Sequence, residues 1–319
     1  MAAAGERPDT VLACGEVRTT LLANSRSLAV GEARELLRLG AADGVRHSTR
    51  PNLYVVSPDV LTGVDCLLPT ATGARVRAVG TVGARAALTE GRVLQSSARF
   101  CVSAAGDDQR RSWGRYLAEP GVLRPVGRLP EPSSVAEGFL EDREQSGRPA
   151  LGAVAERLLA QVLRHPLLDH RPPVKSRRTH LRWAALRATG ATRPSIERFT
   201  LAEDGLRTVK LWLPEGTDWA AAETFCADLA LHDWLLTTLA RLVERGGFGS
   251  TDGHEAVRAL RPAVGLLHLW MPMARTENST TALWETLERE PGFTRQWQTL
   301  AQRIRDQLAL RAILGGPGS

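Results

Sequence analysis

The sequence predicts an α+β protein in which an antiparallel β-rich N-terminal domain precedes a mostly helical domain with one inserted β-hairpin. Three observations support this fold class. β-branched and alternating runs dominate residues 1–132, a polar stretch covers residues 133–150, and apolar residues recur at helical spacing from residue 151 onward. The length of 319 residues also favours about two domains. We therefore expect a β-rich domain at 1–132, a polar linker at 133–150 and a mostly α-helical domain at 151–319.

The N-terminal part contains several strand-like runs separated by turn signals. Residues 9–22 are apolar and β-branched in patches, residues 27–39 favour a short helix, and residues 52–69 are again rich in β-formers. A long Arg-bearing hairpin is expected over residues 75–99, because its two strands flank the turn signal Glu90-Gly91.

The C-terminal part changes to a helical period. Leu151, Val154, Leu158 and Val162 are spaced to lie on one face of a helix. Two β-type runs predict the inserted hairpin at residues 195–214, and helices are expected from residue 217 to the last helix, which begins near Phe293.

Composition excludes some classes of protein and favours a location. The net charge of +6 exerts only a modest attraction on acidic partners. The four cysteines form no CxxC pair and indicate buried thiols in a reducing compartment rather than a zinc site. Residues 1–10 contain no apolar core of the signal-peptide type, and the sequence has no apolar run of about 18 residues. We expect a cytoplasmic protein without a membrane span.

The adjacent pair His232-Asp233 is the first candidate site, because such a pair ligates metal in some phosphohydrolases. On a helix, however, His232 shares an apolar stripe with Phe225, Leu229 and Leu236, whereas Asp233 is rotated about 100° away. The favoured interpretation is a core or interface histidine, with metal binding as the alternative.

The second candidate is a basic segment at residues 171–193, which lacks carboxylates. We expect a helix at about 176–188 that places Arg178 and Arg182 on one face, where they contact phosphate oxygens of a nucleic acid or an acidic partner. The candidate contact residues are Lys175, Arg177, Arg178, Arg182 and Arg187. A solvated basic face is the competing and favoured interpretation, because the whole chain is rich in arginine.

Motifs of catalysis and cofactor binding are missing from the sequence. The glycine-rich segment 244–255 lacks the lysine of a P-loop, and no GxSxG motif occurs. We therefore predict no catalytic residue, no cofactor and no metal ligand, and a non-enzyme is favoured. An enzyme whose site assembles only in three dimensions stays open as an alternative.

Three segments carry a resemblance to a known family: SPDVLTGVDCLLPTATGARVRAVGTVGARAALTEGRVLQ, FCADLALHDWLLTTLARLVER and TALWETLEREPGFTRQW. Together they resemble an uncharacterised actinobacterial protein family over residues 9–314. Its members occur in a conserved streptomycete gene cluster beside a variant P-loop protein and a methyltransferase-like protein. The resemblance implies a cytoplasmic protein that acts with those neighbours, and it implies no fold, activity or site residues.

The sequence as a whole favours a non-catalytic adaptor or regulatory subunit of a cytoplasmic complex, and the resemblance suggests the P-loop protein as its partner. One alternative is a nucleic-acid-binding protein that uses the 171–193 segment together with the Arg-bearing hairpin of residues 75–99. The other alternative is the enzyme with a site assembled only in space. The sequence does not determine the oligomeric state.

Overall fold

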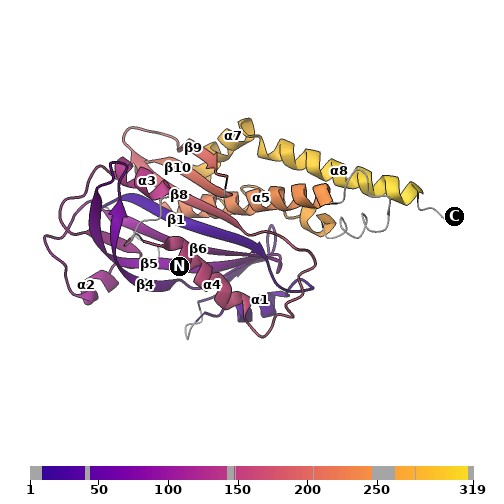
Figure 1. Ribbon diagram of the computed structural model, residues 1–319, viewed down its shortest axis with the longest axis horizontal. Helices are drawn as coiled ribbons and strands as arrows, with labels where there is room; N and C mark the ends of the chain where they lie inside the picture. The colour runs from indigo at the N-terminus through magenta and orange to yellow at the C-terminus, as the bar shows by residue number, and fades with distance from the viewer. Residues whose placement is uncertain are drawn as a thin grey trace.

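A computed structural model describes residues 9–39, 44–141, 147, 149–203, 205–245, 263–276 and 278–314 of the chain, with side chains up to residue 309. Within these ranges one sheet of ten strands forms the centre of the molecule (Figure 1). The strands are β1 (Thr10–Leu21), β2 (Arg46–Ser48), β3 (Tyr54–Val56), β4 (Val60–Pro69), β5 (Arg75–Thr89), β6 (Val93–Ser103), β7 (Val122–Pro125), β8 (Thr179–Ala188), β9 (Ser195–Leu201) and β10 (Leu206–Pro214).

Helices cover both faces of this sheet. Helices α3 and α4 pack on one face, and the long helix α5 packs on the other, where α8 runs beside it (Figure 1). The described helices are α1 (Val30–Leu36), α2 (Trp113–Leu117), α3 (Pro132–Leu140), α4 (Leu151–Leu163), α5 (Trp219–Arg245), α7 (Thr281–Arg289) and α8 (Phe293–Leu314), with a 3-10 turn η1 (Asn278–Thr280) before α7.

The strand order corrects the predicted fold class. The sheet order is β2-β3-β5-β7-β6-β1-β8-β10-β9, with β4 on β5, so strands from both halves of the chain form one sheet. The sheet is also mixed rather than antiparallel, because β8 pairs in parallel with β10 and β6 pairs in parallel with β7. An antiparallel β-rich domain followed by a helical domain with one inserted hairpin is therefore wrong, although both helices and strands are abundant.

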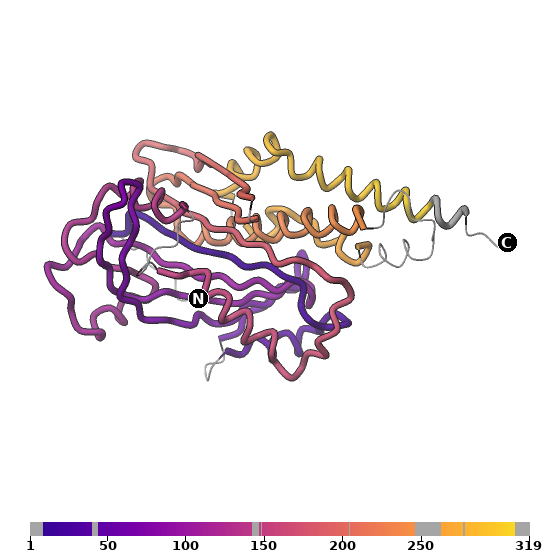
Figure 2. The backbone as a smooth tube through the Cα atoms, viewed as in Figure 1, coloured from indigo at the N-terminus to yellow at the C-terminus, as the bar shows by residue number. Residues whose placement is uncertain are grey.

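The first strand joins the two halves. It pairs antiparallel with β6 on one side and antiparallel with β8 on the other. Figure 2 shows the indigo β1 running beside the rose-coloured β8. Side chains of β1 alternate between the two layers: Leu12 and Cys14 join the core under α4, while Ala13 and Val17 join the core under α5.

The segment predicted as a helix at 176–188 is strand β8. Seven of its ten residues are buried, because the sheet covers both edges of the strand and helices cover both faces. A strand buried on both faces shows no polar–apolar alternation, so its sequence resembles that of a buried helix.

Other predicted elements lie where the sequence places them. The β5–β6 hairpin turns at Glu90 and Gly91, β9 and β10 form the hairpin of residues 195–214, and α4 begins at Leu151. Residues 132–140, mostly within the stretch expected to be a linker, form α3, and its Phe139 is buried in the core under α4.

Strand β7 inserts between β5 and β6 where those strands diverge. Gly80 of β5 makes this insertion possible, because a Cβ atom there would lie 1.9 Å from the backbone oxygen of Val122. Any side chain at residue 80 would push β7 away from the sheet.

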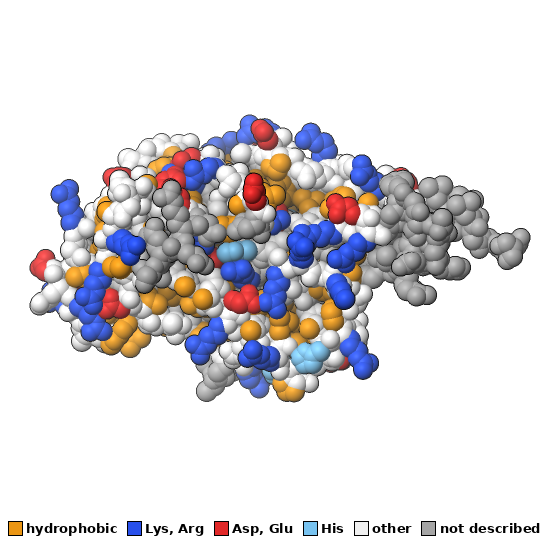
Figure 3. Space-filling model, viewed as in Figure 1, with side chains coloured by type: hydrophobic (Ala, Val, Ile, Leu, Met, Phe, Trp, Pro, Cys, Tyr) orange, Lys and Arg blue, Asp and Glu red, His pale blue; other side chains and the backbone are white. Residues whose placement is uncertain are grey.

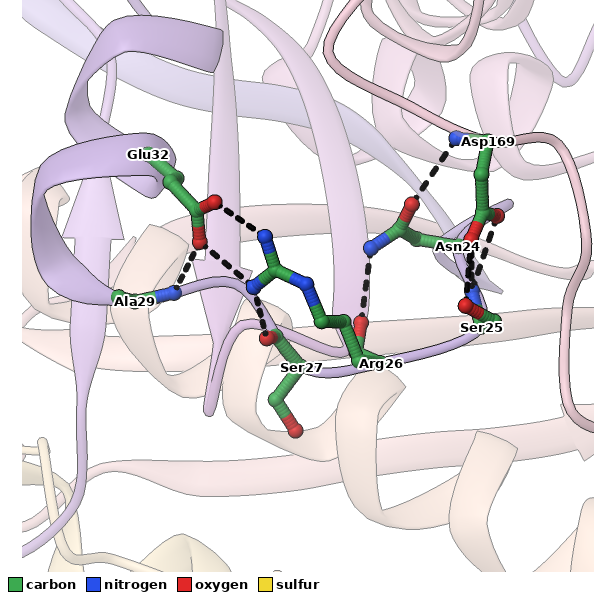
Figure 4. Close-up of polar contacts among 7 residues, drawn as sticks. All are labelled: Asn24, Ser25, Arg26, Ser27, Ala29, Glu32 and Asp169. Atoms are coloured by element: carbon green, nitrogen blue, oxygen red, sulfur yellow. Dashed lines mark hydrogen bonds and ion pairs between the residues drawn. The ribbon is translucent and has the colours of Figure 1, made fainter.

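A polar cluster ties α1 to the loop after α4 (Figure 4). Asp169 accepts hydrogen bonds from the backbone and side chain of Ser25, and its own backbone N–H donates to Asn24 Oδ1 at 3.0 Å. Glu32 pairs with Arg26 and accepts the Ala29 N–H at 2.9 Å. These two contacts hold the pKa of Glu32 at about 2. The cluster satisfies its own charges and serves to fix the entry into α1.

Candidate functional site: an arginine-lined cleft

Strand β8 buries one of the predicted contact residues. Arg182 donates from Nε to Glu16 Oε1 at 2.8 Å, and His180 Nε2 lies 2.5 Å from Glu16 Oε2. Burial by itself would raise the pKa of Glu16, but the hydrogen bond from His180 and the charge of Arg182 outweigh it and lower the pKa. Arg182 therefore stabilises the interior under α4, and it is inaccessible to a polyanion.

The other four predicted residues are not gathered in one patch. Lys175 and Arg177 are exposed, and Arg178 pairs with Glu156 of α4. Arg187 lies on the α5 side, where its guanidinium stacks on the Trp219 ring at 4.0 Å and donates to the Pro214 carbonyl. On the face that carries α4, shown in Figure 3, Lys and Arg side chains are interspersed with Asp and Glu side chains.

The members of the His232-Asp233 pair have separate partners. His232 is fully buried, with Nδ1 2.7 Å from the Asp228 carbonyl and Nε2 accepting the Met271 N–H at 3.2 Å. Burial lowers the pKa of His232, so the ring is neutral. Asp233 instead pairs with Arg207 at 2.6 Å, and burial raises its pKa.

His232 and Asp233 thus serve the packing of α5. The described residues contain no group of three or more His, Cys, Asp or Glu side chains arranged to hold a metal ion. The glycine-rich segment singled out at 244–255 lies outside the described residues from residue 246 onward.

A cleft between the sheet and the first half of α5 does gather charged side chains. It consists of two cavities of about 500 and 440 Å³, which share the walls formed by Arg46, Arg85 and Ala220. Strand β2 and the segment around Arg275 bound the first cavity, and Arg99 and Trp183 line the second. We call the two cavities together the arginine cleft.

The second cavity contains a chain of ion pairs. Glu223 of α5 lies 2.9 Å from Arg85 and 2.8 Å from Arg99, and Arg99 also reaches Asp59 at 2.7 Å. Burial alone would lower the pKa of Arg99, but Glu223 and Asp59 outweigh burial and raise it. The same pairing with Arg99 lowers the pKa of Asp59 against the effect of burial. Charges in this cavity are therefore largely balanced.

The first cavity has a surplus of positive charge. Its lining includes four arginines (Arg46, Arg50, Arg85 and Arg275) and His47, against the single carboxylate of Asp228. Among the described residues, neither Arg46 nor Arg50 has a carboxylate within ion-pair distance. Asp59 interacts with Arg46 at longer range, and Glu223 pairs with Arg85. A concave surface lined by more guanidinium groups than carboxylates attracts anions.

Arg275 is held in place across this cavity. Its guanidinium stacks over the Tyr54 ring at 4.3 Å and donates to Asn52 Oδ1 at 2.9 Å. Its other neighbour is Asp228, whose Oδ2 accepts the Met273 N–H at 2.9 Å. The residues around 271–276 are thereby fixed to α5 and β3, so this wall of the cavity is preorganised.

Comparisons with known proteins add no relative. No family model matches the chain, and searches of curated proteins and of solved structures likewise find no match. None of the described helices combines the length and hydropathy needed to cross a bilayer.

Sequence reasoning missed most of the cleft. Arg85 and Arg99 belong to the Arg-bearing hairpin that the sequence singled out, and Arg187 was among the candidate contacts. Arg46, Arg50 and Arg275 carried no signal, because the first two lie in or just after a three-residue strand and Arg275 is 225 residues away from Arg50 along the chain. Only the sheet topology brings them together.

Proposed function

We propose that the protein is a non-catalytic regulatory subunit that binds an anionic small molecule in the arginine cleft. The observation that carries this proposal is the surplus of arginine around the first cavity, where no carboxylate of the described residues lies within ion-pair distance of Arg46 or Arg50. A cavity of about 500 Å³ also falls within the range of small-molecule sites.

The lining supports binding rather than catalysis. Among the described residues, no hydroxyl of the first cavity is hydrogen-bonded to a histidine or a carboxylate, which is the arrangement that activates a nucleophile. Asp228 is engaged by the Met273 N–H and flanked by Arg275, so it is poorly placed to act as a general base.

The proposal also includes a protein partner and a cytoplasmic location. A regulatory subunit acts through a protein complex, and the resemblance of the sequence suggests a P-loop protein as the partner. Four free cysteines, three of them buried, support a reducing compartment such as the cytoplasm. Co-purification from cells at native expression tests the partnership, and recovery of this chain alone at low salt would contradict it.

The anion site is tested by calorimetric titration with inorganic pyrophosphate and with citrate. We expect at least one of them to bind the unaltered protein, and binding to weaken at least tenfold in the double variant Arg46→Ala/Arg50→Ala. The matched control is Arg303→Ala/Arg305→Ala, which removes the same charge from exposed positions on α8. Equal affinity in the cleft variant and the control would contradict the proposal.

A further inference from the structure

We propose that the anion bound in the arginine cleft is a nucleoside phosphate, with its phosphates at Arg46, Arg50 and Arg85 and its nucleoside against the floor of the first cavity. This inference rests on the proposed function and names the class of ligand. Three properties of the cavity support it, because an inorganic anion alone would not account for them.

The first property is an apolar floor. Val17 of β1, Val56 of β3, Ala87 of β5 and Ala227 of α5 line the cavity beneath the arginines. These side chains are small or branched, and Val56, Ala87 and Ala227 keep some accessible surface that a base or a sugar ring can contact. A free phosphate would contact only the arginine rim, and water would stay on the floor.

The second property is a set of acceptors with spare capacity. Gln95 is 3% exposed, and its Nε2 donates to Thr19 Oγ1 and to the Ala227 carbonyl, which leaves its amide oxygen as an acceptor for the cavity. Asp228 Oδ1 is buried and accepts no hydrogen bond among the described residues, although His232 Nδ1 lies 3.5 Å and Arg275 lies 3.8 Å from it. A buried acceptor whose neighbouring donors lie beyond hydrogen-bond distance has unused capacity, and sugar hydroxyls or base amino groups supply such donors.

The third property is the distribution of charge. Arg46 and Arg50 lie on and just after β2, and Arg85 forms the wall shared with the second cavity. The floor residues and acceptors lie on β1, β3, β5, β6 and α5. A ligand that satisfies both sets has an anionic group joined to an uncharged body that carries hydrogen-bond donors. Nucleoside phosphates have this constitution, and arginines suit their phosphates because a guanidinium can donate two parallel hydrogen bonds.

The test separates the nucleoside from the phosphate. The purified full-length protein is titrated calorimetrically with the diphosphates of adenosine, guanosine, cytidine and uridine, with pyrophosphate and with citrate. We expect at least one nucleoside diphosphate to bind tenfold more tightly than pyrophosphate. If pyrophosphate or citrate binds as tightly as every nucleotide, the nucleoside inference fails and the proposed anion site stands.

If none of these anions binds, the proposed function itself fails.

A variant that fills the floor of the first cavity provides a second measurement. Ala227→Leu places a larger side chain in the cavity, so nucleotide affinity should fall at least tenfold while pyrophosphate affinity changes less than twofold. Ala240→Leu is the matched control, because it is the same substitution on the same helix and lines a different cavity.

Unfolding curves show that both leucine variants fold. If Ala227→Leu leaves nucleotide affinity unchanged, or weakens pyrophosphate to the same extent as nucleotide, the floor is not the nucleoside site and the inference is overturned.

Discussion

On the α4 side of the sheet, Glu16 pairs with both Arg182 and His180. On the α5 side, Glu223 pairs with Arg85 and Arg99, but no carboxylate of the described residues lies within ion-pair distance of Arg46 or Arg50. The two glutamates are equally buried, each with 3% of its side chain exposed. They differ in their surroundings, because α4 packs closely on Glu16, while an open cleft adjoins Glu223.

The comparison separates structural arginines from ligand-binding ones. A buried arginine with a buried carboxylate is electrostatically complete, and its removal affects folding rather than binding. The positive charge of surplus arginines beside a cavity is neutralised only when an anion binds. Substitutions on the two sides should therefore change different properties of the protein.

The largest effect is expected from Glu16→Ala. This substitution leaves Arg182 buried without its carboxylate and also removes the partner of His180, so stability should fall by about 3–5 kcal/mol. Urea unfolding measures the change, and anion binding by the folded fraction should stay the same. A loss below about 1 kcal/mol would show that the cluster is not a closed structural unit.

A smaller loss of stability with a gain in binding is expected from Glu223→Gln. The side chains of Arg85 and Arg99 are 20% and 25% exposed, and Arg99 keeps Asp59, so the cost should be about 1–3 kcal/mol. The amide no longer neutralises Arg85, so affinity for pyrophosphate should rise several-fold. Calorimetry checks this result, and weaker binding would contradict the electrostatic account of the cleft.

The buried ring of His232 predicts that the stability of the folded protein depends on pH. Burial lowers its pKa in the folded state below the ordinary value of 6.5, so the unfolded chain binds the proton more readily. Stability is at its full value above pH 6.5 and falls as the pH drops below it. Thermal unfolding between pH 7.5 and 5.5 should show this decline, and His232→Asn should show less of it. Identical slopes in the two proteins would contradict the assignment.

The smallest effect is expected from Arg178→Ala. Its pair with Glu156 is exposed, with 47% and 39% of the two side chains accessible, so stability should change by less than about 1 kcal/mol. Anion affinity should also stay within twofold, because Arg178 lies outside the cleft. A tenfold loss of nucleotide affinity in this variant would move the binding surface to the α4 side.

Local sequence patterns predicted much of the secondary structure but not how the strands assemble. The hairpins and α4 could be predicted, because their turn residues and apolar spacing act over a few residues. Strand β8 could not be distinguished from a helix, since Leu181, Trp183 and Leu186 are buried whichever conformation they adopt. Local patterns could not predict the cleft. Arg50 and Arg275 line the same cavity only because β3 packs against the segment before η1.

The central place of β1 has a consequence for how the chain is made. Residues 10–21 leave the ribosome well before residues 179–188, so one edge of this strand has no partner until the later segment has emerged. Until then its backbone N–H and C=O groups along that side can pair with another nascent chain. We expect fragments that end near residue 150 to aggregate, and the whole protein to fold slowly and to benefit from chaperones during synthesis.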